Sequence, residues 1–324
     1  MSSVLVTGGM DLIGSWVTRK LIEQGNGVVV YQRHRNETLL NDIIDKFEYV
    51  EGNVLDLPRI IHTIKHYGVE RVIHMATTSP RFLQTNPFMN YKTDVDGALN
   101  IFEASRLLDV KRVVFTSSKA VYERVRGEYA HPAFKPIDED YPKSPMHLYG
   151  ATKLYIEHLG LNYHRIHDLD FIAVRFATTY GPGKTTGGLT GPAVIWSAII
   201  ESAMTGKSLK VPAGEEQIGD LVYHKDIAQG IVGACFAENP EHRVFHLGTG
   251  KGETLQHMLD ILNNMFGEVH IAVDPGLQTS SWRNACVFNI DRARKELGYR
   301  PQYDLEEGTK DYIETMKKLD ISPL

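Results

Sequence analysis

Near its start the chain reads SVLVTGGMDLIG, residues 3–14. Residues 3–7 are mostly apolar or β-branched and predict a buried strand, and the glycines after them predict a tight turn. An amphipathic helix is expected over Ser15–Gln24 and a second apolar strand over Val28–Tyr31. Glycines between a strand and a helix let the backbone approach a pyrophosphate, which the helix N-terminal amides then bind. The stretch therefore predicts a βαβ unit that binds a dinucleotide.

The alternation of strands and helices continues through the first half of the chain. Apolar, β-branched runs predict strands at Phe47–Val50, Arg71–Met75, Lys111–Thr116 and Leu169–Phe176. Helical periodicity covers Leu57–His66, Phe88–Leu108 and His147–His167. Strands that alternate with helices form a parallel sheet covered on both faces, and such sheets bind ligands at the carboxyl ends of their strands.

After Phe176 the composition changes. Residues 181–192 read GPGKTTGGLTGP and form either a mobile loop over a site or a plain surface loop. Beyond them short strands are predicted among helices, at Leu209–Val211, Val244–Leu247 and Val269–Val273. No internal repeat or low-complexity tract is evident.

Size and charge exclude several classes of protein. The 324 residues, 42% of them hydrophobic, suffice for one large or two interlocked domains. Charges nearly balance, with 35 Lys and Arg against 40 Asp and Glu, and no long basic run is present, so nucleic acid is not an expected partner. The N-terminus lacks a signal-type segment and no apolar run approaches about 18 residues, so no membrane association is expected.

The cysteines and histidines suggest neither disulfides nor a metal site. Cys235 and Cys286 make no disulfide framework, which fits the reducing cytoplasm. His62 and His66 lie four residues apart on a predicted helix, but no third ligand is evident. We therefore expect a cytoplasmic protein without a metal.

Tyr149 and Lys153 lie one turn apart on the helix predicted over His147–His167. Residues at this spacing share one face of a helix. An ammonium beside a phenol favours the phenolate and lowers the phenol pKa from its ordinary value of about 10. The pair is therefore either a general base with its charge partner or an ordinary surface pair.

Further motifs occur in an order found in one enzyme family. They are VTGGMDLIGS (6–15), HMA (74–76), TSSKAVY (116–122), SPMHLYGATK (144–153), VRF (174–176), YGPG (180–183), DLVY (220–223), DIA (226–228) and FHLGTG (245–250). Along essentially its whole length the chain resembles the extended short-chain dehydrogenase/reductases, also called the NAD-dependent epimerase/dehydratases. The resemblance implies an α/β fold with a Rossmann-type doubly wound parallel sheet over 1–177 and 220–247. It also implies a smaller C-terminal α+β substrate-binding domain over 178–219 and 248–324.

The resemblance implies a Ser-Tyr-Lys triad. Ser118 would hold the substrate oxygen and Tyr149 would remove its proton. Lys153, helped by the positive nicotinamide ring, would stabilise the tyrosinate and also bind the cofactor ribose. The residues expected to bind the cofactor are Gly8, Met10, Asp11, Leu12, Ile13, Gly14, Gln32, Arg33, Asn53, Val54, Met75, Ala76, Tyr149 and Lys153.

The cofactor positions depart from the family pattern. Asp11 replaces the middle glycine of the loop, and it either turns outward and is tolerated or weakens dinucleotide binding; the triad favours tolerance. Gln32 replaces the carboxylate that NAD enzymes place after the second strand, and Asn53 replaces an Asp. Arg33 or Arg35 could bind the 2′-phosphate of NADP, or both could point into solvent while Gln32 holds the ribose of NAD. We expect NADP to be at least competitive with NAD.

The substrate positions depart too. Thr178 and Gly219 replace an Asn and an Arg that hold the sugar-nucleotide diphosphate, which argues against UDP- and dTDP-sugars. Arg283 lies where another phosphate-binding Arg often occurs. Lys119 follows Ser118 in place of the acidic pair of dehydratases, so elimination of water is not expected. It either binds an anionic group such as a sugar-acid carboxylate or is a solvated lysine. The expected substrate-binding residues are Lys119, Thr178 and Arg283.

Together these features predict an NAD(P)-dependent oxidoreductase or epimerase that transfers hydride reversibly at a secondary hydroxyl of a sugar or sugar-like small molecule. One alternative is a ketone or alcohol reductase with an apolar substrate, lined by Phe82, Trp196 and Trp282. Another is a non-catalytic dinucleotide-sensing protein, suggested by Asp11. The family's counterparts of the two longest predicted helices pair across a twofold axis, which predicts a homodimer.

Overall fold

The computed structural model describes residues 2–78, 86–183, 192–277 and 285–323. Its largest sheet has seven strands in the order β11-β6-β5-β4-β1-β2-β3, and all its neighbours pair in parallel. The strands are β1 (Ser3–Thr7), β2 (Gly27–Gln32), β3 (Glu48–Glu51), β4 (Arg71–His74), β5 (Arg112–Ser118), β6 (Phe171–Phe176) and β11 (Val244–Leu247). The order reverses between β1 and β4, which defines a doubly wound sheet.

Both faces of this sheet are buried. Successive side chains of a strand point to opposite faces, so each strand contributes to two hydrophobic cores. Val4 and Val6 of β1 belong to one core and Leu5 belongs to the other. The first core includes α1 (Leu12–Glu23), α8 (His224–Phe236) and α10 (Asp291–Glu296). The second includes α2 (Leu57–His66), α5 (Gly97–Leu107) and α6 (Leu148–His167). This explains why the strands read as continuous apolar runs.

The strands predicted before Phe176 are all confirmed, with ends within two residues of those expected. The single helix predicted over Phe88–Leu108 is interrupted. It consists of α4 (Pro87–Tyr91), a π-helical turn η2 (Lys92–Asp96) and α5. The turn carries the buried carboxylate of Asp94, and π-helical turns often occur at functional sites.

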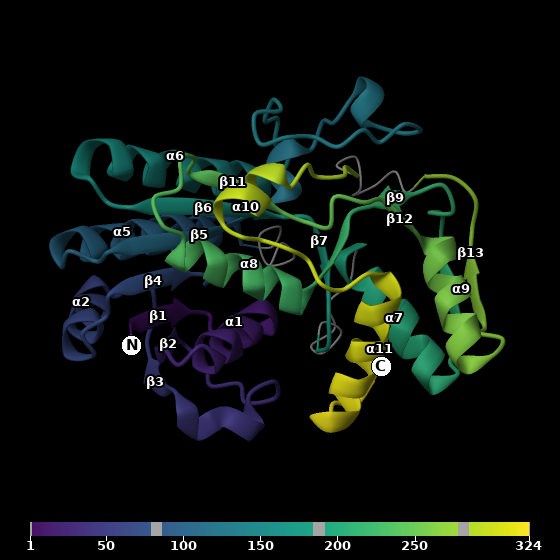
Figure 1. Cartoon of the computed structure of the whole chain (residues 1–324), viewed down its shortest axis with the longest axis horizontal. Coiled ribbons are helices and arrows are strands. Elements are labelled where there is room, and N and C mark those ends of the chain that lie inside the picture. The colour runs from purple at the N-terminus through teal and green to yellow at the C-terminus, as the bar shows by residue number, and fades with distance from the viewer. Residues whose placement is uncertain (1, 79–85, 184–191, 278–284, 324) are drawn as a thin grey trace.

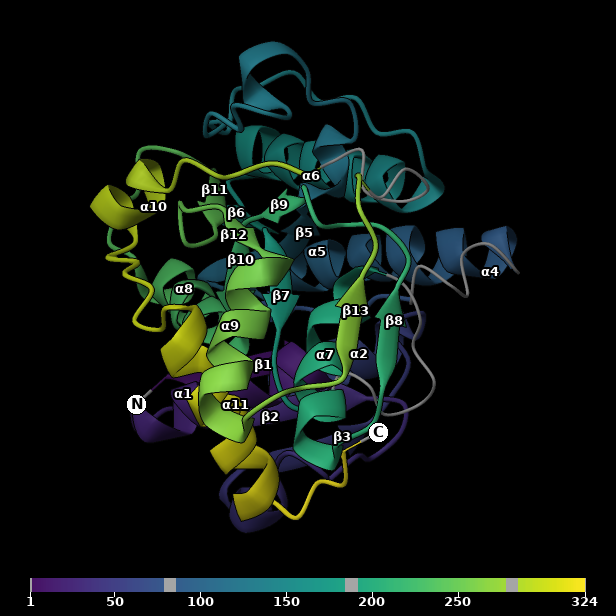
Figure 2. The same ribbon diagram turned by 90° about the vertical axis from the view of Figure 1, so that its right-hand side faces the viewer.

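A second unit lies beside the sheet, on the right in Figure 1 and facing the viewer in Figure 2. Its helices are α7 (Pro192–Thr205), α9 (Leu255–Phe266) and α11 (Leu305–Lys318). Its strand pairs are β7 (Thr178–Tyr180) with β10 (Leu221–Tyr223), β8 (Leu209–Val211) with β13 (Ile271–Val273), and β9 (Ile218–Gly219) with β12 (Glu253–Thr254). Apart from β9 and β12, these elements share a separate hydrophobic core.

Short 3-10 turns complete the described chain: η1 (Asn41–Lys46), η3 (Lys119–Tyr122) and η4 (Gly127–Tyr129). Most of the loop predicted over 181–192 lies outside the described residues. Cys235 and Cys286 are buried and free. None of the helices within the described ranges combines the length and the apolar character needed to cross a bilayer.

Candidate active site

The carboxyl ends of β1, β2, β4 and β5 lie along one edge of the sheet. Thr7 pairs with Tyr31 on one side and with His74 on the other, and His74 pairs with Phe115. The segments that follow these residues therefore start side by side. This edge, where the strand order reverses, is the usual binding position in a doubly wound sheet.

The Gly-rich turn after β1 forms a tight cradle at this edge. Gly8 has φ +73°, a left-handed conformation that favours glycine. A Cβ atom on Gly14 would lie 1.9 Å from the Gly8 carbonyl oxygen, so only glycine permits this approach of α1 to the turn. Helix α1 begins directly afterwards, at Leu12 and Ile13, and directs its N-terminal amides at the cradle. These residues fit a dinucleotide pyrophosphate.

Asp11 lies beside the cradle in contact with Gln32. The Gln32 side chain donates from Nε2 to Asp11 Oδ1 at 3.3 Å and accepts from the Met10 amide at 3.0 Å. Burial raises the pKa of the Asp11 carboxyl, while the charge of Arg33 opposes that shift. The loop aspartate, the glutamine that replaces the usual acid and the following arginine thus form one group at the end of β2.

The other expected cofactor residues lie at the same edge. The amides of Met75 and Ala76 each donate to Thr7 Oγ1 at 3.1 Å. Asn53 caps the turn after β3 by accepting from the Leu55 amide at 3.0 Å, and Val54 beside it is buried. These expected cofactor positions, which follow β3 and β4, therefore lie along the same sheet edge as the glycine cradle.

Ser118, Tyr149 and Lys153 converge from β5 and α6. Ser118 ends β5, and Tyr149 lies in the first turn of α6. The Lys153 ammonium donates to the carbonyl of Thr116 at 2.9 Å, which fixes it to the end of β5. A Cβ on Gly150 would lie 2.2 Å from the Ala120 carbonyl, so the glycine lets the helix approach closely.

Burial shifts the pKa values of both Tyr149 and Lys153. Burial raises the pKa of Tyr149 to about 12; a hydrogen bond with Ser118 opposes this, and the charge of Asp94 adds to it. Burial also lowers the pKa of Lys153 to about 8, against the attraction of Asp94 and Glu157. In the protein without its cofactor desolvation dominates the pKa of Tyr149, and the lowering expected from Lys153 and the nicotinamide ring stays a prediction.

Asp94 is a candidate site residue that no sequence motif singled out, and its charge influences both Tyr149 and Lys153. Its buried carboxylate accepts hydrogen bonds from the Thr78 amide at 2.8 Å and from the Thr77 hydroxyl at 3.0 Å. Asp94, Ala98 and Ile101 follow the spacing of a buried helix face. A carboxylate on such a face was the signal that could have identified it.

A pocket opens on the side of the second unit. It is lined by Lys119, Ile195, Trp196, Gln217, Ile218, Gly219, Leu255 and Ala285. Lys119 Nζ donates to Thr178 Oγ1 at 2.7 Å, so two of the three expected substrate residues meet here. The third, Arg283, lies outside the described residues, as do Phe82 and Trp282.

The chain belongs to the NAD-dependent epimerase/dehydratase family, whose model matches residues 4–248. It is accordingly an NAD-dependent enzyme of the extended short-chain dehydrogenase/reductase type. Proteins similar to it are named as UDP-sugar 4-epimerases, so the family acts on sugar substrates.

Relatives are similar over nearly the whole chain. A putative UDP-glucose 4-epimerase of Methanocaldococcus jannaschii is 29% identical, covering 97% of this chain and 98% of its own. A UDP-glucuronate 4-epimerase of Thermodesulfobacterium geofontis is 25% identical, covering 99% and 100%. The crystal structure of the Thermotoga maritima UDP-glucose 4-epimerase with UDP-glucose has a TM-score of 0.84 at 26% identity, covering 98% and 99%.

Proposed function

We propose that the protein is a sugar epimerase whose catalytic residues are Ser118, Tyr149 and Lys153. The observation that carries this proposal is the convergence of the three residues beside the glycine cradle, at the sheet edge where a nicotinamide cofactor would bind. A hydroxyl, a phenol and an ammonium in this arrangement serve proton transfer at an alcohol oxygen.

Removal of hydride from a secondary alcohol leaves a carbonyl only if the hydroxyl proton also departs. NAD, when bound, accepts the hydride and can return it. Ser118 holds the substrate oxygen, Tyr149 takes the proton and later gives it back, and Lys153 stabilises the phenolate. Hydride returned to the opposite face of the carbonyl would give the epimer.

The proposed substrate is a nucleotide-linked hexose, bound between the sheet edge and the second unit, which carries α7, α9 and α11. The lengthwise similarity to UDP-sugar 4-epimerases supports this proposal. Thr178 and Gly219 stand where the family has an Asn and an Arg for the diphosphate, so we expect the diphosphate to contribute less affinity here than in those relatives. Arg283 is a further candidate ligand.

The test is incubation with free sugars, sugar acids and UDP-sugars. Products are separated chromatographically, and nicotinamide absorbance is followed in parallel. Conversion of a sugar to its epimer without net cofactor reduction supports the proposal. Tight dinucleotide binding without turnover of any substrate would instead favour a non-catalytic sensing protein.

A ketone or alcohol reductase with an apolar substrate is the second candidate. It is favoured by the apolar lining of the pocket by Ile195, Trp196, Ile218 and Leu255. If a hydrophobic ketone oxidises the reduced cofactor and sugars do not, the protein is a reductase rather than an epimerase.

We also propose that NADP competes with NAD at this site, and that Arg33 is responsible. Arg35 is paired with Glu37 at 2.5 Å and lies 5.4 Å from the centre of the Tyr49 ring. Arg33 instead lies close enough to Asp11 for its positive charge to oppose the rise in the pKa of that carboxyl. Of the two arginines, Arg33 is therefore better placed for a phosphate on the adenosine ribose.

Arg33→Ala should raise the Michaelis constant for NADP about tenfold or more, since a hydrogen bond to a charged group contributes about 1.5–3 kcal/mol. The constant for NAD should barely change. Arg35→Ala is the matched control and should alter neither. Equal effects of Arg33→Ala on both cofactors, or a wild-type preference for NAD, would contradict the assignment.

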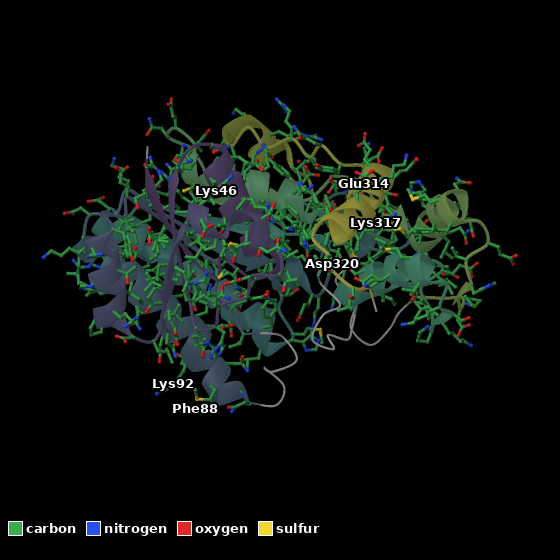
Figure 3. The ribbon with its side chains drawn as sticks, turned by 90° about the horizontal axis from the view of Figure 1, so that it is seen from below. Lys46, Phe88, Lys92, Glu314, Lys317 and Asp320 are labelled. Carbon is green, nitrogen blue, oxygen red and sulfur yellow. The ribbon has the colours of Figure 1, made fainter. Side chains whose placement is uncertain are left out.

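A cytoplasmic homodimer is the proposed state of the protein. Helices α5 and α6 pack together through Phe102 and Tyr163, whose ring centres are 5.8 Å apart. Their outer surface, with α4, exposes apolar side chains at Phe88, Met89, Tyr91, Leu99, Leu107, Leu148, Tyr155 and Ile166. Phe88 and Lys92 project at one extremity of the molecule (Figure 3). Such a surface suits an isologous helix pairing.

The combined substitution Leu99→Glu and Tyr155→Glu should convert the dimer to a monomer, because it places charges on both helices of the proposed interface. Light scattering at micromolar concentration measures the mass. Phe266→Glu is the control, since Phe266 is similarly exposed but ends α9 at the far side of the molecule (Figure 1). A wild-type mass equal to one chain would refute the dimer.

A further inference from the structure

We infer that Lys119 selects sugars that carry an anionic group, a carboxylate on the sugar itself. This inference rests on the proposed function, because it concerns the substrate of the same site. It assigns a specificity role to a residue outside the catalytic triad.

Lys119 is built into the pocket wall next to the reacting position. It follows Ser118 directly and opens the 3-10 turn η3 at the end of β5. The opposite wall is contributed by Trp196 of α7 and by residues 217–219 of the second unit. A ligand in this pocket therefore contacts Lys119, which directly follows the triad serine in the chain.

The ammonium of Lys119 is largely shielded from water, and a hydrogen bond fixes its position. Its Nζ donates to Thr178 Oγ1 at 2.7 Å, which holds the side chain between β5 and β7. Burial lowers the pKa of Lys119, while the nearby Cys286 and Asp220 oppose that shift. A substrate carboxylate would add a stronger opposing charge, and charges interact more strongly where water is excluded. An anionic ligand should therefore bind to this site more tightly than a neutral one of the same size.

Asp220 is the carboxylate whose charge opposes the lowering of the Lys119 pKa by burial, but it is already hydrogen-bonded to backbone amides. Its carboxylate accepts from the amides of Thr249 at 2.7 Å, Phe288 at 3.1 Å and Gly250 at 3.4 Å, and from the Thr249 hydroxyl at 2.8 Å. These bonds tie β10 to the segments after β11 and before α10. Asp220 therefore has a structural role that does not depend on Lys119.

The position of Lys119 favours a carboxylate on the sugar over the diphosphate. Ser118 would hold the reacting oxygen of the sugar, and Lys119 follows it directly at the end of β5. Gly219, where the family has a diphosphate-binding arginine, lines the same pocket and offers no charge. A hexuronate places its charge on the ring that Ser118 would hold.

The test compares four probes by titration calorimetry: glucuronate, glucose, UDP-glucuronate and UDP-glucose. The protein carries its nicotinamide cofactor. Wild-type protein should bind the acid member of each pair about 10- to 100-fold more tightly, as expected for one charge-assisted hydrogen bond. Lys119→Met should reduce this preference to about onefold and leave the affinity for the neutral sugars within about threefold.

Thr178→Val is the matched control, since it removes the hydrogen bond that holds Lys119 but keeps the charge. It should retain most of the acid preference. Thermal melting of each variant verifies folding, and Lys119→Arg should partly restore the preference if Lys119→Met proves unstable.

Two results overturn the inference. Equal loss of affinity for both UDP-sugars in Lys119→Met, with no effect on free glucuronate, would assign the lysine to the diphosphate. No acid preference in wild-type protein would exclude an anionic sugar. Acid-selective binding without epimerisation would leave the inference standing and refute only the proposed reaction.

Discussion

Tyr149→Phe is expected to lower turnover by about 10²- to 10⁴-fold, the usual contribution of a general acid–base. Phenylalanine keeps the ring against Lys153, whose ammonium lies 5.7 Å from the Tyr149 ring centre. Only the proton-transferring hydroxyl is lost. Steady-state kinetics measures turnover, and protein fluorescence titration with the dinucleotide should show nearly unchanged binding.

Tyr155→Phe is the matched control on the same helix. Tyr155 is 53% exposed on the surface of α6, so loss of its hydroxyl should leave turnover unchanged. If Tyr149→Phe retains a tenth or more of wild-type activity, Tyr149 is not the acid–base. A combined loss of turnover and cofactor affinity would instead indicate that Tyr149 shapes the cofactor site.

The parts predicted correctly from the sequence are those that local physics determines. The strands of the large sheet were visible because burial on both faces requires continuous apolar runs. The glycine turn was visible because Gly8 needs a positive φ and Gly14 tolerates no Cβ atom. Since the carboxyl ends of parallel strands meet at one edge of the sheet, the sequence alone places the residues after β1 to β5 together.

Long-range packing supplied what the sequence could not. At the helix interruption η2, Asp94 accepts hydrogen bonds from Thr77 and Thr78, which precede it by 16 residues or more. The lining of the pocket joins positions from Lys119 to Ala285. Whether the pKa of Tyr149 is raised or lowered depends on how completely the protein surrounds the phenol. The sequence spacing between Tyr149 and Lys153 does not reveal this.

A buried ion pair fixes the catalytic helix to the sheet. Arg175 of β6 donates to Glu157 of α6 from Nε at 2.9 Å and from Nη2 at 2.6 Å. The Ser117 hydroxyl of β5 also donates to Glu157, and both charged side chains are at most 3% exposed. Glu157 lies one turn after Lys153, so the pair holds the helix segment that carries the proposed triad.

Glu157→Gln should lower the free energy of unfolding by about 3–5 kcal/mol, because it leaves the Arg175 guanidinium buried without its counter-charge. Glutamine keeps the size of the side chain, so the loss reports charge rather than a cavity. Equilibrium urea unfolding measures it. Glu306→Gln is the control: its partner Lys310 is equally exposed on α11, and such a surface pair contributes about 0.3–0.5 kcal/mol.

The combined variant Glu157→Gln and Arg175→Met separates the two possible origins of that loss. If the uncompensated guanidinium is responsible, removal of the charge should restore much of the stability, since apolar replacements of buried ion pairs are often neutral. If the hydrogen bonds themselves are responsible, the double variant should be at least as unstable as the single one. A loss below about 1 kcal/mol in Glu157→Gln would contradict both explanations, because it would mean that water or rearrangement compensates the buried charge.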